Sequence, residues 1–355
     1  MKNIQSIKSL FLLLTFTILS CSRGGSGGDE EPQLPGLKNL TVDVEVVGKN
    51  SENPNGDGSG IVNFIAKADN ATNYKILIDG ETKESSNGKF SHTFKIGGVN
   101  TYQVIVVAYN GTQNISQNIN VTVLVNSQLV WSDEFNYEGA PDSAFWIHEI
   151  GNGDGWGNNE LEYYTNRLDN AIVSNGTLKI NLKKESFEGF NYTSARLITK
   201  GKYSFKYGKI EFRAKLPTGA GTWPALWMLG SNIDTVPWPA CGEIDVMEHV
   251  GNQQNIIHGS LHSPQHYGGN ADTGTVNIPT ASTEFHIYSV EWNASSIKFF
   301  VDGQLYHSYA NNAATPFNSN FFIIMNVAMG GNFGGNVDPN FVASTMEVDY
   351  VRVYQ

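Results

Sequence analysis

The sequence predicts an all-β protein in which a small β-sandwich precedes a larger β-sandwich. From residue 37 onward, short runs of alternating apolar and polar residues recur between Gly- and Asn-rich turn signals. We find no convincing amphipathic pattern of helical period. The chain has 355 residues, 40% of them hydrophobic, enough for one large core or two separate ones. Its net charge of −11 opposes binding to a polyanion, so nucleic acid is disfavoured as a partner.

Residues 1–20 have the pattern of a signal peptide. Lys2 and Lys8 are followed by an apolar run, FLLLTFTILS, that is too short for a permanent membrane span. The motif ILSC resembles the lipobox of bacterial lipoproteins, which implies lipidation of Cys21; an ordinary signal with an incidental cysteine is the alternative. Residues 21–36 are Gly/Ser-rich and then acidic, as in a flexible stalk. We therefore expect a lipid anchor in a bacterial membrane, with the outer membrane favoured and the protein facing the periplasm or the cell surface.

Residues 37–126 predict the small sandwich. Runs such as TVDVEVV, IVNFIAKA, YKILIDG and YQVIVVAY are separated by turn signals at NPNGDGSG and YNGTQN. The pattern resembles PKD/immunoglobulin-like modules. All seven Trp residues lie outside it, from Trp131 onward, so the module lacks the indole surface that favours sugar binding. We expect a spacer, with a glycan-binding module as the alternative.

Residues 127–355 predict the larger domain. Strand-like runs include TLKINLK, KIEFRAKL, EIDVME, IKFFVDG, FFIIMNVAM and MEVDYVRVY. So many strands in one domain are most simply two curved sheets packed face to face. Such curvature leaves a concave face, which is a natural groove for an extended polymer.

The motif GEIDVMEH in this domain contains three acids. Because side chains alternate along a strand, Glu243 and Asp245 share one face. Glu248 lies at an odd offset from Glu243 and would point to the other face. One extra residue in a β-bulge, at Met247 or a neighbour, restores it to the face of the other two.

Three acids among apolar residues repel one another and are costly to bury, so a purely structural role would rarely retain them. A solvated edge strand and a metal cluster are the alternatives. Ile244, Val246 and Met247 argue for a buried strand, and Ca²⁺ loops use Gly-broken turns instead. Retaining hydrolysis of a glycosidic bond needs two carboxyl groups about 5–5.5 Å apart, which is close to the separation along one strand face. We therefore predict acid/base catalysis on a glycosidic bond.

The motif GEIDVMEHVG resembles the signature of glycoside hydrolase family 16, in the bulged form typical of its laminarinases (endo-β-1,3-glucanases). The resemblance continues in order through WSDEF, WGNNELEYYTNR, ARLITKGKYSFKYGKIEFRAKLP, GTWPALWMLG, HGSLHSP, MNVAMGGNFGG and VDYVRVYQ. It implies a jelly roll and double displacement with retention on β-1,3-glucan. No cofactor is expected for catalysis. Mixed-linkage glucan, a marine galactan, or a non-catalytic glycan-binding lipoprotein are the alternatives.

The same resemblance implies a division of labour among the acids. Glu243 would be the nucleophile, Glu248 the general acid/base, and Asp245 a hydrogen-bonding neighbour that sets the charge of the nucleophile. We expect the glutamate in the more apolar surroundings to keep its proton while the other stays ionised. Residues alone do not say which glutamate is which.

Several residues are candidates for substrate binding. Trp223, Trp227 and Trp238 lie just upstream of the acids, and indole faces stack on sugar rings. Core packing is the alternative, and for Trp227 the two readings are equally supported. By the resemblance, Arg196 reaches the substrate or orients the nucleophile, and Asn159 contacts a sugar on the non-reducing side.

Two further candidates come from neighbouring strands. His262 is expected in the cleft beside the catalytic strand, and Asn326 on a strand that crosses the cleft. Many laminarinases carry Gln where Glu162 stands, and NWPG where this chain has residues 332–335, NFGG. These departures concern the two ends of the groove.

The resemblance also implies a structural Ca²⁺ on the convex side, at Glu134, Gly176 and Asp349 and largely through backbone oxygens. A zinc site among the recurring histidines of HGSLHSPQHYGGN is disfavoured, because Ser-Pro and Gly-Gly exclude a helix there. Cys241, the one cysteine besides Cys21, is expected to be a small buried side chain. We expect a monomer.

Overall fold

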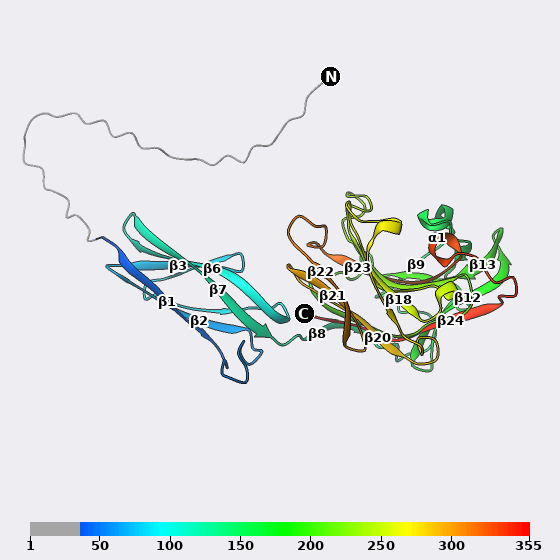
Figure 1. Ribbon diagram of the computed structural model, residues 1–355, viewed down its shortest axis with the longest axis horizontal. Helices are drawn as coiled ribbons and strands as arrows, with labels where there is room; N and C mark the ends of the chain where they lie inside the picture. Colours follow the sequence, from blue (N-terminus) through cyan, green and yellow to red (C-terminus); the bar gives the residue numbers. More distant parts are fainter. Residues whose placement is uncertain (1–35) are drawn as a thin grey trace, which may run out of the picture.

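The computed structural model describes residues 36–355 (Figure 1). The predicted signal peptide, Cys21 and nearly all of the predicted stalk lie outside the described residues. Within them the all-β prediction is confirmed: strands form two bodies, and the helices are single turns such as α1 (Gly331–Gly334). No helix in this part of the chain is long and apolar enough to cross a membrane.

The N-terminal body, drawn in blue to cyan-green in Figure 1, consists of two small antiparallel sheets. One contains β1 (Lys38–Val46), β2 (Ile61–Asp69) and β5 (Lys89–Thr93); the other contains β4 (Glu81–Ser85), β3 (Asn73–Ile78), β6 (Gly98–Asn110) and β7 (Gln113–Val125). Alternate residues such as Val62, Phe64, Val104 and Val106 are buried in a core of their own. The predicted alternation thus follows the two faces of each sheet.

The larger body follows β7 after a connection of three residues and has a sheet of ten strands. Its main path is β10-β13-β12-β24-β15-β20-β21-β22, with β11 paired to β12 and β8 paired to β24. The bounds are β8 (Leu129–Asp133), β10 (Glu162–Tyr164), β11 (Ala171–Ser174), β12 (Thr177–Phe187), β13 (Phe190–Ser194), β15 (Gly208–Lys215), β20 (His286–Trp292), β21 (Ser296–Val301), β22 (Gln304–Ala310) and β24 (Ala343–Tyr354).

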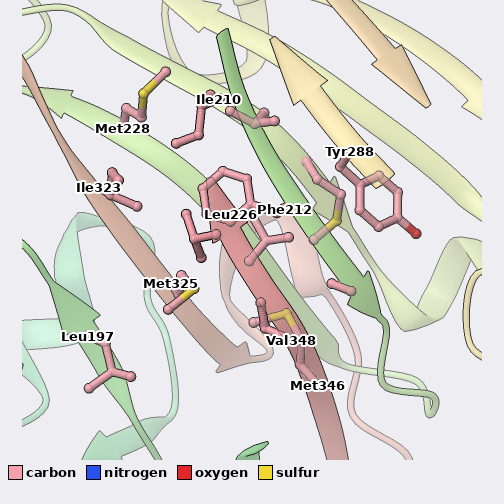
Figure 2. Close-up of a cluster of buried hydrophobic side chains, with 14 of the residues drawn as sticks. Leu197, Ile210, Phe212, Leu226, Met228, Tyr288, Ile323, Met325, Met346 and Val348 are labelled. Atoms are coloured by element: carbon pink, nitrogen blue, oxygen red, sulfur yellow. The ribbon is translucent and has the colours of Figure 1, made fainter. Parts of the chain in front are cut away.

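A second sheet of seven strands packs against the first, in the order β19-β18-β17-β16-β23-β14-β9. The bounds are β9 (Ile147–Glu149), β14 (Arg196–Ile198), β16 (Thr222–Gly230), β17 (Glu243–His249), β18 (Ile256–His262), β19 (Asp272–Asn277) and β23 (Phe321–Met329). Figure 2 shows the core between the sheets, where Met325 and Leu226 of this sheet approach Phe212 and Val348 of the other. The predicted two-sheet sandwich is therefore confirmed.

Strand β23 has no polar alternation, because both of its faces are covered. All nine of its residues are buried. Ile323 and Met325 face the intersheet core, whereas Phe322 and Ile324 pack on the outer side with Ile198. The apolar run FFIIMNVAM thus belongs to an inner strand of the sheet that carries the site.

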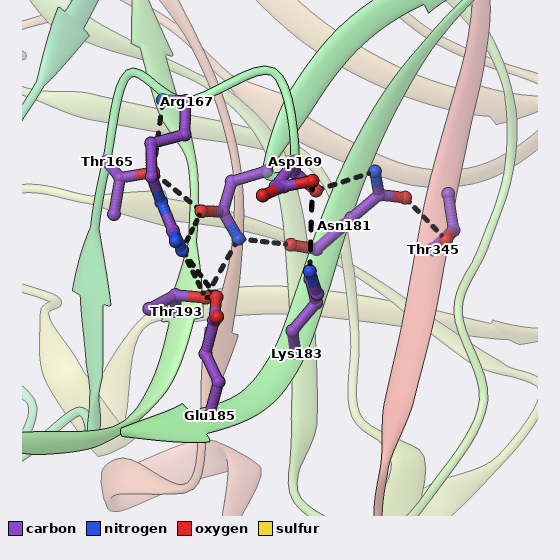
Figure 3. A network of polar contacts seen from close by, with 9 residues as sticks. Thr165, Arg167, Asp169, Asn181, Lys183, Glu185, Thr193 and Thr345 are labelled. Atoms are coloured by element: carbon purple, nitrogen blue, oxygen red, sulfur yellow. Dashed lines mark hydrogen bonds and ion pairs between the residues drawn. The ribbon is translucent and has the colours of Figure 1, made fainter. Parts of the chain in front are cut away.

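A polar network fastens the loop after β10 to the ten-stranded sheet (Figure 3). Arg167 of the loop forms an ion pair with Glu185 of β12 and a hydrogen bond with Thr193 of β13 (3.2 Å). Asn170, at the end of the loop, donates to Thr193 Oγ1 (3.0 Å) and to the backbone oxygen of Asn181 (3.1 Å). The network therefore fixes β10, whose first residue lies behind the cleft described next.

Candidate active site

Strand β17 is an inner strand of the seven-stranded sheet, between β18 and β16, and carries the three acids. Asp245 and Glu248 pair with Ser260 and His258 of β18, which are only two residues apart. The segment between the acids therefore contains one residue more than the segment opposite. On the β16 side the unpaired residue is Val246. The predicted bulge is confirmed, and it lies at Val246, the neighbour of Met247.

The bulge sends the acids and the apolar residues of β17 to opposite faces. Ile244, Val246 and Met247 join the intersheet core, each at most 1% exposed. Glu243, Asp245 and Glu248 line a cleft of about 630 Å³ over the outer face of the sheet. The three acids thus lie on one face, as the spacing predicts.

Each glutamate accepts a hydrogen bond from an indole. Trp238 Nε1 donates to Glu243 Oε2 (3.1 Å), and Trp223 Nε1 donates to Glu248 Oε1 (3.0 Å). Ser260 of β18 adds a longer bond to Glu248 Oε2 (3.4 Å). These donors stabilise a negative charge on either carboxylate.

His262 lies beside the other two acids, so the strand placement predicted for it is found. Its Nε2 is 3.1 Å from Asp245 Oδ2 and 3.5 Å from Glu243 Oε1. Ligand atoms of Glu243, Asp245 and His262 all lie within 4.8 Å of one another, so this group could hold a metal ion. The same atoms are those that acid/base chemistry would use.

Burial raises the pKa of all three acids. Desolvation, reinforced by the charge of Asp245, raises the pKa of Glu243 and of Glu248 to about 8 in each case. Desolvation also raises the pKa of Asp245 well above its usual range. The pKa values of the two glutamates are thus raised to a similar extent. The expectation that the glutamate in the more apolar surroundings keeps its proton while the other stays ionised therefore stays a prediction.

Arg196 and Trp227 form one side of the cleft together with Trp156. The Arg196 guanidinium lies 4.4 Å from the ring centroid of Trp156 and 4.9 Å from that of Trp227. Its Nε is 2.5 Å from Glu149 Oε2. Sequence reasoning missed Trp156, although it stands in the WGNNE segment, because an indole in a Gly-rich loop gives no periodic signal.

Asn326 lines the cleft on β23, where its side chain accepts a hydrogen bond from Trp227 Nε1 (2.8 Å). Phe333, in the segment that departs from NWPG, also lines the cleft. Its ring packs edge-on against Trp223 (centroids 5.5 Å apart) and His258 (5.0 Å). The cleft therefore keeps an aromatic ring at the position where the resemblance leads one to expect tryptophan.

Asn159 is the one predicted binding residue that does not line the cleft. Its side chain is exposed and donates to Asn332 Oδ1 (2.8 Å), which joins two loops at the rim. The sugar contact predicted for Asn159 stays a prediction. Its neighbours Asn158 and Glu160 line the cleft instead.

The residues predicted to bind Ca²⁺ belong to the ten-stranded sheet and its hairpin, away from the cleft. Both carboxylates are engaged by arginines: Arg352 binds Glu134 through two nitrogens (3.0 and 2.8 Å), and Arg213 binds Asp349 (2.6 Å). Gly176 lies in the turn between β11 and β12. An ion there would rely on backbone oxygens, and the calcium site stays a prediction. Cys241 is free and fully buried, in agreement with the role expected for it.

Two carboxyl groups on one strand, each with an indole donor, in a groove lined by tryptophans, define a site for hydrolysis of glycosidic bonds. The family model "Glycosyl hydrolases family 16" matches residues 158–352. The chain therefore belongs to that family. A second model, that of the β-glucan synthesis-associated proteins SKN1/KRE6/Sbg1, matches residues 73–240.

Individual relatives agree with the family. The beta-glucanase of Rhodothermus marinus is 47% identical over 244 residues, which is 64% of this chain and 85% of that protein. Glucan endo-1,3-beta-glucosidase A1 of Niallia circulans is 40% identical over 263 residues, 65% of this chain and 38% of that protein. The X-ray structure of the laminarinase from Rhodothermus marinus superposes with a TM-score of 0.62 at 46% identity, and the match covers 65% of this chain and 98% of that one.

Proposed function

We propose that the protein is an endo-acting, retaining hydrolase of β-1,3-glucan. The observation that carries the proposal is the bulged strand β17, which brings Glu243 and Glu248 to one face of the cleft with an indole donor on each. Identity of 40% or more to a beta-glucanase, a glucan endo-1,3-beta-glucosidase and a laminarinase supports this polymer and this reaction.

The mechanism uses the two glutamates in turn. Glu243 attacks the anomeric carbon while Glu248 gives its proton to the leaving glycosidic oxygen, which leaves a glycosyl ester on Glu243. Glu248, now ionised, takes a proton from water, and the resulting hydroxide equivalent releases the sugar from Glu243. Asp245 and His262 adjoin the nucleophile and adjust its charge. Retention follows from two inversions at one carbon.

The cleft favours a neutral polymer. Among the described residues that line it, Arg196 is the one Arg or Lys, and Glu149 already neutralises it. A sulfated galactan would bring many anionic groups into a groove that four acids line and whose one Arg or Lys is already paired. Mixed-linkage glucan, which is also neutral, is the nearest competitor.

A small polysaccharide panel tests the function. Laminarin should give the highest specific activity, with oligosaccharides of several lengths as early products and the β-anomer appearing first in proton NMR. Higher activity on carrageenan, porphyran or mixed-linkage glucan would refute the substrate, and an early α-anomer would refute retention.

We further propose that Cys21 carries a lipid that anchors the protein to the outer membrane. Support comes from the ILSC motif after a basic and apolar segment. One myristoyl chain binds a membrane only reversibly, and a lipobox cysteine carries several acyl chains. Cys21→Ala should leave the membrane fraction or fail to mature. A Cys21→Ala protein that still sediments with membranes would contradict this.

Residues 37–126 are proposed to be a PKD/immunoglobulin-like spacer. Support comes from their two small sheets, their lack of Trp, and a core that is separate from that of the larger body. A chain starting at Gln128 keeps β8 and its pairing with β24, so its turnover of soluble laminarin should match that of the longer form. Loss of turnover with an intact fold would overturn the spacer role.

A further inference from the structure

Two acids that the mechanism does not use lie at the edge of the cleft: Glu160, which lines it, and Glu162, which does not. Glu162, the first residue of β10, is 0% exposed, and Glu160 is 6% exposed. Glu162 Oε2 accepts a hydrogen bond from the backbone N–H of Met329 (2.6 Å). Glu162 Oε1 has no hydrogen-bond partner among the described residues. Burial of a carboxylate oxygen without a hydrogen-bond donor costs free energy, so the protonation of Glu160 and Glu162 needs an explanation.

Glu160 already has two donors. Asn158 Nδ2 donates to Oε1 (3.1 Å), and the Tyr164 hydroxyl donates to Oε2 (3.2 Å). A proton on Glu162 Oε1 turns that atom from an unsatisfied acceptor into a donor to Glu160. Burial and the adjacent charge of Glu160 raise the pKa of Glu162 well above its ordinary range, in the direction that this proton requires.

From Glu160 a directed series of hydrogen bonds leads to the cleft. The Tyr164 hydroxyl accepts from Asn326 Nδ2 (3.0 Å), and Asn326 Oδ1 accepts from Trp227 Nε1 (2.8 Å). Every donor in the series points toward Glu160, so an ionised Glu160 polarises all of them. The series ends at the Trp227 ring, beside the Arg196 guanidinium.

The same segment also holds the rim of the cleft. Glu160 forms a β-bridge with Gly330, and Leu161 N donates to Met329 O (3.0 Å). Asn332 N donates to Asn158 O (2.7 Å). Displacement of Glu160 would therefore loosen two loops as well as the hydrogen bonds to Trp227.

We propose that Glu160 and Glu162 share one proton and act as a positioning pair, which through Tyr164 and Asn326 holds Trp227 in place for sugar binding. The role in sugar binding rests on the proposed glucanase function. Neither acid touches the bond that is cleaved. Loss of the shared proton would leave two adjacent charges away from water, and the pair would separate and release Trp227. Glucan affinity should fall while the chemistry at Glu243 and Glu248 is preserved.

The charged and titratable groups around Glu162 do not offer it another partner. Glu160 and Tyr164 belong to its own segment, and Tyr192 stands opposite it on β13. Arg196 of β14 lies beside Trp227 at the far end of the series, and it is paired with Glu149 of β9. Strand β23 presents only Asn326 and the Met329 backbone.

Glu162→Gln is the decisive variant, because its amide can donate permanently to Glu160 while its carbonyl accepts from Met329. As the pH is raised, KM for laminarin should rise about fivefold more in the wild type than in Glu162→Gln, as for loss of one net hydrogen bond. The two proteins should have the same kcat at each pH. Glu162→Leu, which can neither donate nor accept, should raise KM at every pH. An equal alkaline rise of KM in wild type and Glu162→Gln would overturn the proposal.

A readout that needs no glucan separates this proposal from the proposed function. The folded protein holds the proton above the ordinary glutamate pKa of 4.5, so the stability that the proton contributes is lost as pH rises through the raised pKa. The Tm of Glu162→Gln should therefore fall less steeply with pH than that of the wild type. If no β-glucan is cleaved or bound but this difference is seen, the shared proton stands and the glucanase function falls. Parallel Tm curves would refute the shared proton even in an active glucanase.

Discussion

The indole N–H of Trp238 donates to Glu243 Oε2 across 3.1 Å, although the Trp238 side chain is 42% exposed. The Trp238 ring thus donates to the buried acid through its N–H edge while it also lines the cleft. Trp223 stands in the same relation to Glu248. Each acid is therefore coupled to the ring that is expected to stack on the neighbouring sugar.

Trp238→Phe and Trp223→Phe separate these two roles, because phenylalanine can stack but cannot donate. A hydrogen bond to a charged group contributes about 1.5 kcal/mol, so each change should lower kcat on laminarin by about tenfold. KM should change less than kcat. Initial-rate kinetics checks this, with the Ala variants as a comparison in which stacking is lost as well. A Phe variant with wild-type kcat would show that the N–H does not assist catalysis.

The roles of the two glutamates can be told apart by azide. Glu243→Gln removes the attacking group and should be inactive on laminarin and on an activated aryl glycoside. Glu248→Ala should lower the activity on laminarin by about 10²–10⁴-fold. It should still give an initial burst of product from the aryl glycoside, because that leaving group needs no proton. Azide should then restore its turnover as a β-glycosyl azide.

Asp245→Asn should fall between those two variants, because it perturbs the charge of the nucleophile without replacing it. If Glu243→Gln were the variant rescued by azide, the roles would be reversed and the site would stand. If both glutamate variants kept near wild-type activity, β17 would not be the catalytic strand.

Stability should fall as the pH rises from 5 to 9. The pKa of Glu243 is about 8 in the folded protein against 4.5 ordinarily, so the folded form holds a proton that the unfolded chain releases in this window. The stability from that proton is complete below pH 4.5 and is lost above about pH 8. Glu243→Gln, neutral throughout, should have the higher Tm at pH 9, with about 2–4 °C for each kcal/mol gained. Calorimetry at pH 5, 7 and 9 checks the slope, and a wild-type Tm that rises with pH would contradict it.

Gly259→Ala should damage both stability and activity. Gly259 lies opposite the bulge of β17, and an added Cβ would come within 2.3 Å of Tyr306 Oη and 2.6 Å of Phe299 Cδ1. Overpacking of this kind costs about 1–3 kcal/mol. Pushing β18 away would also displace Ser260, which donates to Glu248. Chemical denaturation and kcat measure the two effects.

Tyr306→Phe is the matched control for Gly259→Ala. It removes a buried hydroxyl that has no hydrogen-bond partner among the described residues, so alone it should be nearly neutral. Combined with Gly259→Ala it should restore part of the lost stability. No restoration in the double variant would mean that the clash lies elsewhere.

The sequence was sufficient to predict the elements that depend on a local pattern of residues. Alternation indicates most strands, and the odd offset of Glu248 predicts the bulge. Contacts between distant segments have no such signal. Tyr164 and Asn326, 162 residues apart, meet only through the sheet, and neither spacing nor composition predicts it. Trp156 was missed because a Gly-rich loop has no periodic pattern that would mark one of its side chains. The pKa of each glutamate depends on burial in three dimensions, which the sequence alone does not specify.

The bulge in β17 is not required to align the acids. Without Val246, Glu248 would lie four residues after Glu243, an even offset, and a regular strand would still present all three acids to the cleft. What the extra residue adds is a second consecutive apolar side chain in the core, because Val246 and Met247 are both buried there. Burial of such a side chain contributes about 1.5–3 kcal/mol. Deletion of Val246 should therefore lower the stability of the protein and leave its catalytic chemistry unchanged. The length of this motif is thus set by the packing of the sandwich, independently of the reaction.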